Sequence, residues 1–140
     1  MRANPLYKAL TALVVLCVLG SCTSRPKHSE PGPVFTMARL EGQVLDIQVR
    51  VLPQSIEFTN TTPRRFETPR VWLNRWYSTR IDSIEPGQRV VIPLRAFADE
   101  HGRSPQAGGF FSSREQEHIV SVELQHESRL EKLVIVTTER

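Results

Sequence analysis

Apolar side chains recur at every second position through much of the C-terminal part of this 140-residue chain. Between 45 and 51, aliphatic residues alternate with Asp46, Gln48 and Arg50. Successive side chains of a strand point to opposite faces, so this spacing gathers the aliphatic groups on one face and the polar groups on the other. The pattern predicts half-buried β-strands. A helix is expected nowhere except for a single turn near 95–100.

The same alternation predicts further strands at 55–60, 70–74, 76–84, 90–94, 120–125 and 130–137. The segment 85–88 reads Glu-Pro-Gly-Gln, with proline and glycine where a type II turn needs them. Pro93 cannot donate to a β-ladder, which predicts that its strand lies at a sheet edge or ends there. The apolar run 133–136 lacks polar alternation and predicts a strand covered on both faces.

Seven or so short strands with closely spaced turns predict an all-β domain of about one hundred residues. An antiparallel two-sheet sandwich of immunoglobulin or fibronectin type accommodates that number of strands. A small β-barrel is the alternative fold. No internal repeat divides the region, which indicates a single domain.

The N-terminal segment has the order of a secretory signal. Arg2 and Lys8 precede a continuous apolar stretch at 9–19, and the small residues Gly20 and Ser21 follow it. A membrane-spanning helix needs roughly 20 apolar residues, about twice what this stretch offers. A cleaved signal is therefore favoured over a transmembrane anchor.

The run Leu19-Gly20-Ser21-Cys22 resembles the lipobox of bacterial lipoprotein precursors. That resemblance implies that the lipoprotein signal peptidase recognises Leu19, Gly20 and Ser21 and cuts before Cys22, whose thiol carries a diacylglyceryl group. Two or three acyl chains hold a protein stably on a membrane.

The lipobox also implies an organisation and a location for the whole chain. It predicts a signal peptide at 1–21, a lipidated and Pro/Ser-rich tether at 22–33, and a β-domain at 34–140. The expected location is the bacterial cell envelope. Thr23 stands where an aspartate would resemble an inner-membrane retention signal, which favours the outer membrane, with the domain facing the periplasm.

A second, looser resemblance covers about 56–102. The segments Phe58-Thr59-Asn60, Val71-Trp72-Leu73-Asn74, Ile84-Glu85-Pro86-Gly87 and Ile92-Pro93-Leu94 are similar to a pattern in small immunoglobulin-like domains of uncharacterised bacterial envelope proteins. That family has no assigned catalytic residues, so the resemblance transfers no chemistry.

The sequence contains no signature of a catalytic or cofactor site. It has no nucleophile elbow, no His-Glu-x-x-His and no phosphate-binding loop. Asp99, Glu100 and His101 precede a glycine and are interpreted as a solvated turn rather than metal ligands, and His118 and His126 are expected at strand ends on the surface. We therefore expect no enzyme activity, no cofactor and no metal.

Charge and cysteine content constrain the partners and the stability of the mature domain. Without its signal the chain is nearly neutral, so binding to nucleic acid is not indicated. Cys17 lies in the signal and Cys22 would carry lipid, which leaves no thiol to form a disulfide. A packed core must therefore stabilise the domain.

One group of residues is a candidate binding surface: Arg64, Arg65, Arg70, Trp72, Arg75 and Trp76. If Val71 and Leu73 face the core, Trp72 points outwards, where arginines could stack on its ring. The alternative is that Trp72 or Trp76 packs between the sheets, as a tryptophan of a sandwich often does, and that the arginines are merely solvated.

These observations predict a lipid-anchored envelope protein whose non-catalytic β-sandwich binds a partner protein or serves a structural role. The alternative is a carbohydrate- or peptidoglycan-binding module that uses the exposed tryptophans and arginines.

Overall fold

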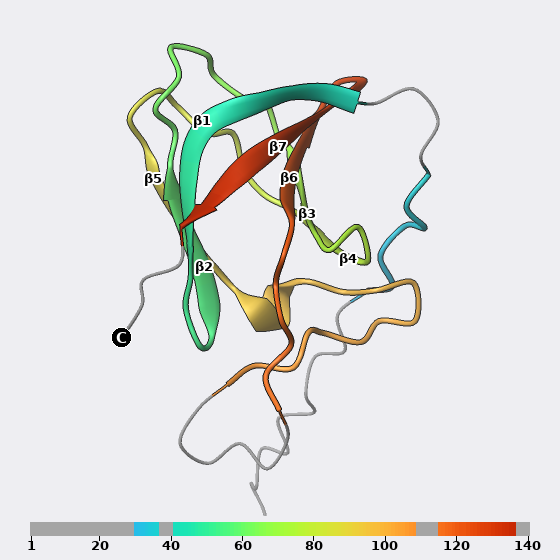
Figure 1. The fold of residues 1–140 in the computed structure, drawn as a ribbon. Coiled ribbons are helices and arrows are strands. Elements are labelled where there is room, and N and C mark those ends of the chain that lie inside the picture. The colour runs from blue at the N-terminus through green and yellow to red at the C-terminus, as the bar shows by residue number, and fades with distance from the viewer. Residues whose placement is uncertain (1–29, 37–40, 109–114, 137–140) are drawn as a thin grey trace, which may run out of the picture.

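The computed structural model describes residues 30–36, 41–108 and 115–136, and these form an almost entirely β structure (Figure 1). The all-β prediction is confirmed. The predicted signal peptide, with Leu19, Gly20 and Ser21, and the predicted lipidation site Cys22 lie outside the described residues. The strands are β1 (Glu41–Val51), β2 (Ser55–Thr59), β3 (Arg70–Leu73), β4 (Tyr77–Arg80), β5 (Arg89–Pro93), β6 (Val122–His126) and β7 (Arg129–Val136), with one 3-10 turn, η1 (Leu94–Ala96).

The seven strands form one hydrogen-bonded sheet in the order β4-β3-β6-β7-β1-β2-β5. Neighbouring strands are antiparallel except β1 and β7, which run parallel. The expected antiparallel two-sheet sandwich is not confirmed, because the sheet is mixed and curls into a half-barrel. Pattern reasoning could not detect the parallel pair, since its strands are joined only through the whole intervening chain.

The curl of the sheet is concentrated in β1. Its pairing with β7 shifts register twice, between Glu41 and Val44 and again between Val44 and Gln48. Such bulges bend a strand and increase its twist. In Figure 1, β1 arches over the domain and then turns down beside β2, so that one strand joins both halves of the sheet.

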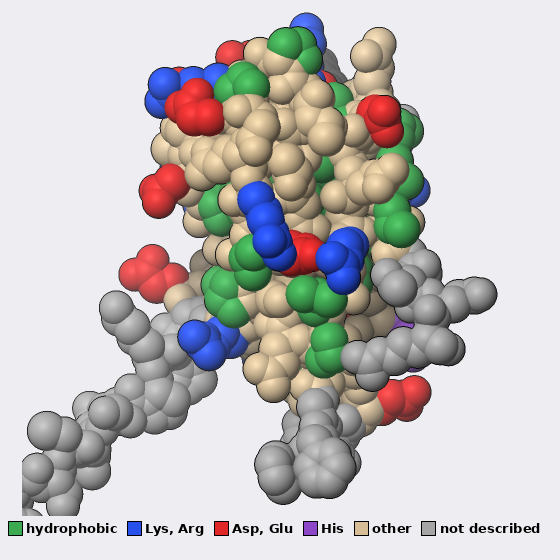
Figure 2. All heavy atoms as spheres, turned by 90° about the vertical axis from the view of Figure 1, so that its left-hand side faces the viewer, with side chains coloured by type: hydrophobic (Ala, Val, Ile, Leu, Met, Phe, Trp, Pro, Cys, Tyr) green, Lys and Arg blue, Asp and Glu red, His purple; other side chains and the backbone are tan. Residues whose placement is uncertain are grey.

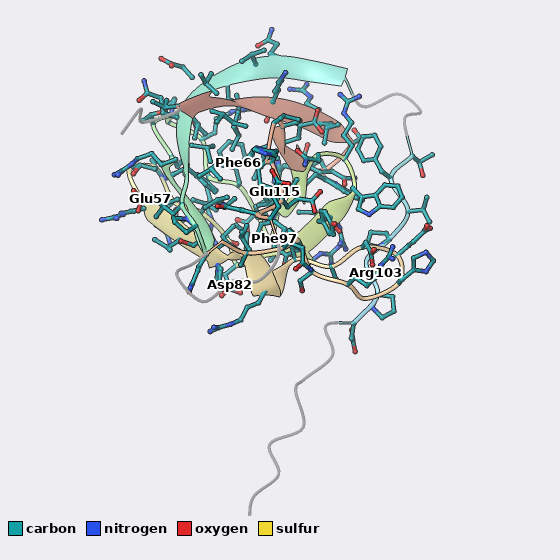
Figure 3. The ribbon with its side chains drawn as sticks, turned by 60° about the horizontal axis from the view of Figure 1, so that its bottom comes forward. Glu57, Phe66, Asp82, Phe97, Arg103 and Glu115 are labelled. Carbon is teal, nitrogen blue, oxygen red and sulfur yellow. The ribbon has the colours of Figure 1, made fainter. Side chains whose placement is uncertain are left out.

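The two halves of the sheet enclose a single apolar core. The predicted alternation in β1 is confirmed, because Leu45, Ile47 and Val49 are buried while the intervening polar residues are exposed. Both ends of the sheet contribute to one cluster: Leu45, Ile47, Val49, Ile56, Phe58, Phe66, Val71, Leu73, Ile84, Ile92, Leu94, Phe97, Ile119, Val122, Leu124 and Leu133. Figure 3 shows Phe66 and Phe97 in the interior.

Two of the predictions for turns and edges are confirmed. Gly87 has a φ of 76°, as its place in the turn requires, and the Gln88 amide donates to the carbonyl of Glu85. Strand β5, which contains Pro93, lies at the edge of the sheet.

Three other predictions need correction. The run 133–136 is not covered on both faces, because Val134 and Val136 are 39% and 37% exposed on the outer side of β7. The strand predicted at 76–84 is confined to β4, and Ile84 instead bridges Phe66. Strand β6 begins at Val122, which leaves Val120 exposed.

Residues 30–36, which we call the strap, lie against the outer face of β3 and β4. The Gly32 amide donates to the carbonyl of Asp99 at 2.7 Å, and the Phe35 ring meets the edge of Trp72 with centroids 5.0 Å apart. A side chain at Gly32 would collide with the carbonyl oxygen of Ala98, so glycine permits the close approach. Among the described residues, no helix has the length and hydrophobicity to cross a membrane.

Candidate binding surfaces

A row of side chains crosses the outer face of four adjacent strands. The register aligns Val136 of β7 with Arg50 of β1, Arg50 with Glu57 of β2, and Glu57 with Val91 of β5. Because directly paired residues share a face, all four point away from the core. Figure 2 views this side of the molecule and shows an acidic side chain between two basic ones.

Glu57 forms the centre of that row. Its carboxylate accepts a hydrogen bond from Arg89 and lies 2.8 Å from Arg50 Nη1, and its side chain is only 10% exposed. The hydrogen bond from Arg89, supported by the positive charge of both arginines, lowers the pKa of Glu57 from its ordinary value. Glu57 is therefore an ionised carboxylate that orients two arginines.

The arginines and the neighbouring apolar groups remain accessible. The side chains of Arg50 and Arg89 are 57% and 68% exposed, and Val91 is 55% exposed. A cleft of about 580 Å³ adjoins them, lined by Asp46, Gln48, Arg50, Glu57, Phe58, Thr59, Thr61, Arg89 and Val136. We call Arg50, Glu57, Arg89, Val91 and Val136 the arginine face. Exposed aliphatic groups beside arginines held in position are suited to contact with another protein.

Sequence reasoning did not single out the arginine face. It placed Arg50 on the polar side of a strand, but which strands lie side by side could not be read from the alternation. The available signal was a charged residue on the polar side of two predicted strands, Arg50 at 45–51 and Glu57 at 55–60, with Arg89 directly before the strand predicted at 90–94.

The six residues predicted as one surface are divided by the structure into two groups. Arg64 pairs with Glu131 of β7 at 2.8 Å, and its guanidinium lies 5.1 Å from the centre of the Phe66 ring. Arg65 pairs with Glu67 and Glu85. The other four residues belong to β3 and to the turn that follows it, so the predicted cluster around a tryptophan does not form as one surface.

Trp72 is buried, but it lies under the strap on the outer face of β3 and not, as the packing alternative predicted, between two sheets. It does point outwards, as the core positions of Val71 and Leu73 require, but the strap covers it and leaves 3% exposed. Its Nε1 donates to Gln125 at 2.8 Å. Because this ring is covered, it does not offer a platform for a sugar.

Arg70 shares the outer face of β3 and is also partly buried. Its Nη1 donates to Ser78 Oγ at 3.1 Å. Burial, with a smaller contribution from the charge of Arg80, lowers the pKa of Arg70 from its ordinary value. This arginine therefore contributes to packing against β4.

The turn between β3 and β4 holds two non-glycine residues in the left-handed region. Asn74 and Arg75 have φ values of 53° and 56°, and the Trp76 amide donates to the carbonyl of Leu73. These are the angles of a type I′ hairpin turn, for which asparagine is a favoured first residue and glycine, rather than arginine, the favoured second. Such a conformation persists where the surroundings fix it.

Side-chain contacts fix this turn from both sides. Asn74 Nδ2 donates to the carbonyl of His118 at 2.8 Å, and Asn74 Oδ1 accepts from the amide of Val120 at 2.9 Å. Arg75 binds the buried carboxylate of Glu123 through Nε and Nη2, with distances of 2.8 to 3.1 Å. The turn is therefore held rigidly to β6 and to the segment before it.

The rigid turn presents Trp76 to solvent. Its side chain is 52% exposed, in contrast to the 3% of Trp72. It lines a cleft of about 300 Å³ together with Pro33, Val34, Phe35, Arg75 and Glu100. We call Trp76 and Val34, which is 66% exposed, the Trp76 surface.

The acidic segment at 99–101 leads into a turn, as predicted, but the expected solvation is wrong for Asp99, which is buried. Asp99 is 1% exposed, and its carboxylate accepts from the amides of His101 and Arg103 and from Arg103 Nε at 2.7 Å. Burial alone would raise the pKa of Asp99, but these hydrogen bonds outweigh it and lower the pKa from its ordinary value. The carboxylate of Asp99 therefore stabilises the turn through its hydrogen bonds to His101 and Arg103.

His118 precedes β6, whereas His126 is the last residue of that strand. His118 is exposed, whereas His126 is half-buried and accepts a hydrogen bond from the Glu67 amide at 3.0 Å through Nε2. Within residues 30–36, 41–108 and 115–136, no three side chains of histidine, cysteine, aspartate or glutamate converge to hold a metal ion.

Comparison with protein-family models, with curated proteins and with solved structures found no match to this chain.

Proposed function

We propose that this chain is a lipid-anchored protein of the bacterial cell envelope whose strand domain binds a partner protein. The lipobox-like run ending in Cys22 supports the anchor, and the arginine face supports the binding role. The domain would act by contact and not by catalysis, and the expected location is the outer membrane, with the domain in the periplasm.

The strand pairings support an immunoglobulin-like interpretation of the half-barrel. Strand β2 pairs with β5, and β3 pairs with β6, which pairs with β7. These are the pairings of strands B with E and of C, F and G in an immunoglobulin domain. In this interpretation β1 joins the two layers, because it bonds to β2 on one side and to β7 on the other.

The observation that carries the binding role is the row Val136, Arg50, Glu57 and Val91. Exposed valines on a sheet face are not needed for the core. Glu57 holds Arg50 between the two valines and Arg89 beside Val91 on β5. A partner with an apolar patch and a carboxylate could bury the valines and pair with the arginines at the same time.

The anchor is tested by Cys22→Ala in cells supplied with a clickable fatty acid. The wild-type protein should take up label, and the variant should not. Cys17→Ala is the matched control, since it removes the other thiol of the chain and should leave labelling intact. Labelling of the Cys22→Ala protein at the wild-type level would contradict the anchor.

The binding role is tested with Val91→Glu in a pull-down from detergent-solubilised envelope. Val91 is exposed, so the substitution should leave the fold intact while placing a charge in the arginine face. The control is Val120→Glu, which makes the same change at a residue 74% exposed outside that face. A protein captured by the wild type and the control, but not by Val91→Glu, supports the proposal. Equal capture by both variants would contradict it.

The carbohydrate- or peptidoglycan-binding alternative now depends on Trp76. Trp72 lies under the strap, while Trp76 remains 52% exposed beside Arg75. A single exposed ring can stack on one sugar, so Trp76→Ala should abolish binding to purified peptidoglycan if this alternative holds.

A further inference from the structure

The strap and the turn before β4 form one structural unit that ties the N-terminal end of the domain to an exposed tryptophan. Phe35 of the strap contacts both Trp72 and the guanidinium of Arg75, the latter at 5.3 Å from the ring centre. Pro33, Val34 and Phe35 line the same cleft as Trp76. The point where the chain leaves the domain towards Cys22 is therefore close to the Trp76 surface.

The sequence limits how far this surface can lie from a lipid on Cys22. Seven residues, 23–29, lie between Cys22 and Glu30. The eight steps from one Cα to the next span at most about 29 Å, even when the segment is fully extended. Glu30 is three residues from Pro33, so the Trp76 surface is within reach of a bilayer that holds the acyl chains.

The chemistry of the surface suits the boundary between lipid and water. Tryptophan is enriched at membrane interfaces, where its ring lies among the headgroups and its N–H stays hydrated. Val34 adds a second exposed apolar group. The basic group beside them is already occupied, since Arg75 is paired with Glu123. Trp76 and Val34 therefore offer apolar contact, and the exposed carboxylate of Glu100 lines the same cleft.

The rigidity of the turn is explained by such a role. A turn fixed by its neighbours holds a tryptophan ring at one place on the surface, which a loose loop would not do. Here Asn74 and Arg75 keep left-handed angles because His118, Val120 and Glu123 hold them, and the ring of Trp76 is kept in solvent.

From these observations we propose that Trp76 and Val34 dock on the surface of the lipid bilayer and set the orientation of the domain. This inference rests on the proposed lipid anchor at Cys22. It directs the arginine face away from the membrane, because the strap and β5 lie on opposite sides of the domain in Figure 1. Figure 3 likewise places Arg103, which binds Asp99 near the strap, on the side opposite Glu57.

The test uses the full-length lipidated protein in phosphatidylcholine vesicles that contain brominated lipid, which quenches nearby tryptophan. The chain has only two tryptophans, and Trp72 is buried. Quenching should therefore come from Trp76, and Trp76→Phe should reduce it at least twofold. Equal quenching in the wild type and in Trp76→Phe, or none in the wild type, would overturn the docking.

A second variant separates orientation from mere proximity. Val91→Trp combined with Trp76→Phe moves the exposed tryptophan to the arginine face, and it should be quenched no more than Trp76→Phe alone. Quenching at position 91 as strong as at position 76 would show that the domain has no fixed orientation, which would overturn the inference.

Mass spectrometry of the Cys22-containing peptide from the same preparation distinguishes the failure of the lipid anchor from the failure of the docking. Lipid on Cys22 without quenching of Trp76 would overturn the docking and leave the anchor standing. A bare Cys22 would overturn the anchor, and with it the docking that depends on it.

Discussion

Gly32→Ala should release the strap from the domain while leaving the core folded. An added Cβ would lie 2.5 Å from the carbonyl oxygen of Ala98, far inside contact distance. That carbonyl cannot move aside easily, because Ala98 and Ser78 exchange two backbone hydrogen bonds of 2.9 and 3.0 Å. The strap must therefore shift outwards.

The magnitude follows from the contacts that such a shift breaks. Loss of the hydrogen bond from the Gly32 amide to Asp99 costs about 1 kcal/mol. Loss of the edge contact between Phe35 and Trp72 costs about 1 kcal/mol more. A total of about 2 kcal/mol lowers the Tm of a domain of this size by roughly 8–16 °C. Phe35 is not a member of the core cluster, so the variant should still fold.

Two measurements check this prediction. Thermal unfolding followed by circular dichroism gives the change in Tm, and acrylamide quenching of fluorescence reports whether Trp72 has become accessible. Thr36→Ala, an exposed position in the same strap, is the control and should change neither. If Gly32→Ala also matches the wild type in both measurements, the strap does not depend on close approach at Gly32 and the reasoning is wrong.

Three further substitutions test single features of the fold. Gly87→Val meets no neighbouring atom but forces a β-branched residue to a φ of 76°, so urea denaturation should show a loss of about 1 to 3 kcal/mol; an unchanged midpoint would contradict the assigned turn. The pKa of Asp99 is lowered from its ordinary 3.8, so its stabilising contribution is present above that pH and disappears as the pH falls through the folded-state pKa. Asp99→Asn should therefore weaken the dependence of the free energy of unfolding on pH in that range, and a pH dependence parallel to that of the wild type would refute this. Glu123→Gln removes the carboxylate that holds Arg75 and should lower the free energy of unfolding by about 1 kcal/mol in urea denaturation, since that arginine is partly solvated. Glu67→Gln, at an exposed ion pair, should have a smaller effect, and a larger one would contradict this prediction.

Local features of this fold could be predicted from the sequence because each depends on neighbouring residues. Alternation at 45–51 determines which side chains of β1 are buried, and the proline and glycine at 86 and 87 determine a turn. Pro93 marks an edge because of its own missing N–H. Each of these predictions can be made without information on which strands pair with one another.

Features that depend on strand neighbours could not be predicted in this way. The position of Trp72 on the outer face follows from alternation, but its burial depends on the strap, which comes from more than thirty residues earlier. The outer valines of β7 look like a buried run in sequence, and only the absence of a covering layer among the described residues makes them exposed. The pairing of Glu57 with Arg50 and Arg89 likewise requires the order β1-β2-β5.

The same dependence explains why the arginine face and the Trp76 surface lie on different sides of the domain. A sheet that curls around one core has outer faces pointing in different directions, and the strap covers part of only one of them. On the covered side, Trp72 is buried under the strap, and Trp76 is exposed at the turn next to the strap. The uncovered side carries the arginine face. If Cys22 carries the proposed lipid, the side from which the chain leaves towards it lies nearer the membrane, and the opposite side is accessible to the proposed protein partner. On this reasoning, substitutions at Trp76 should alter contact with lipid without altering protein capture, and substitutions at Val91 should do the reverse.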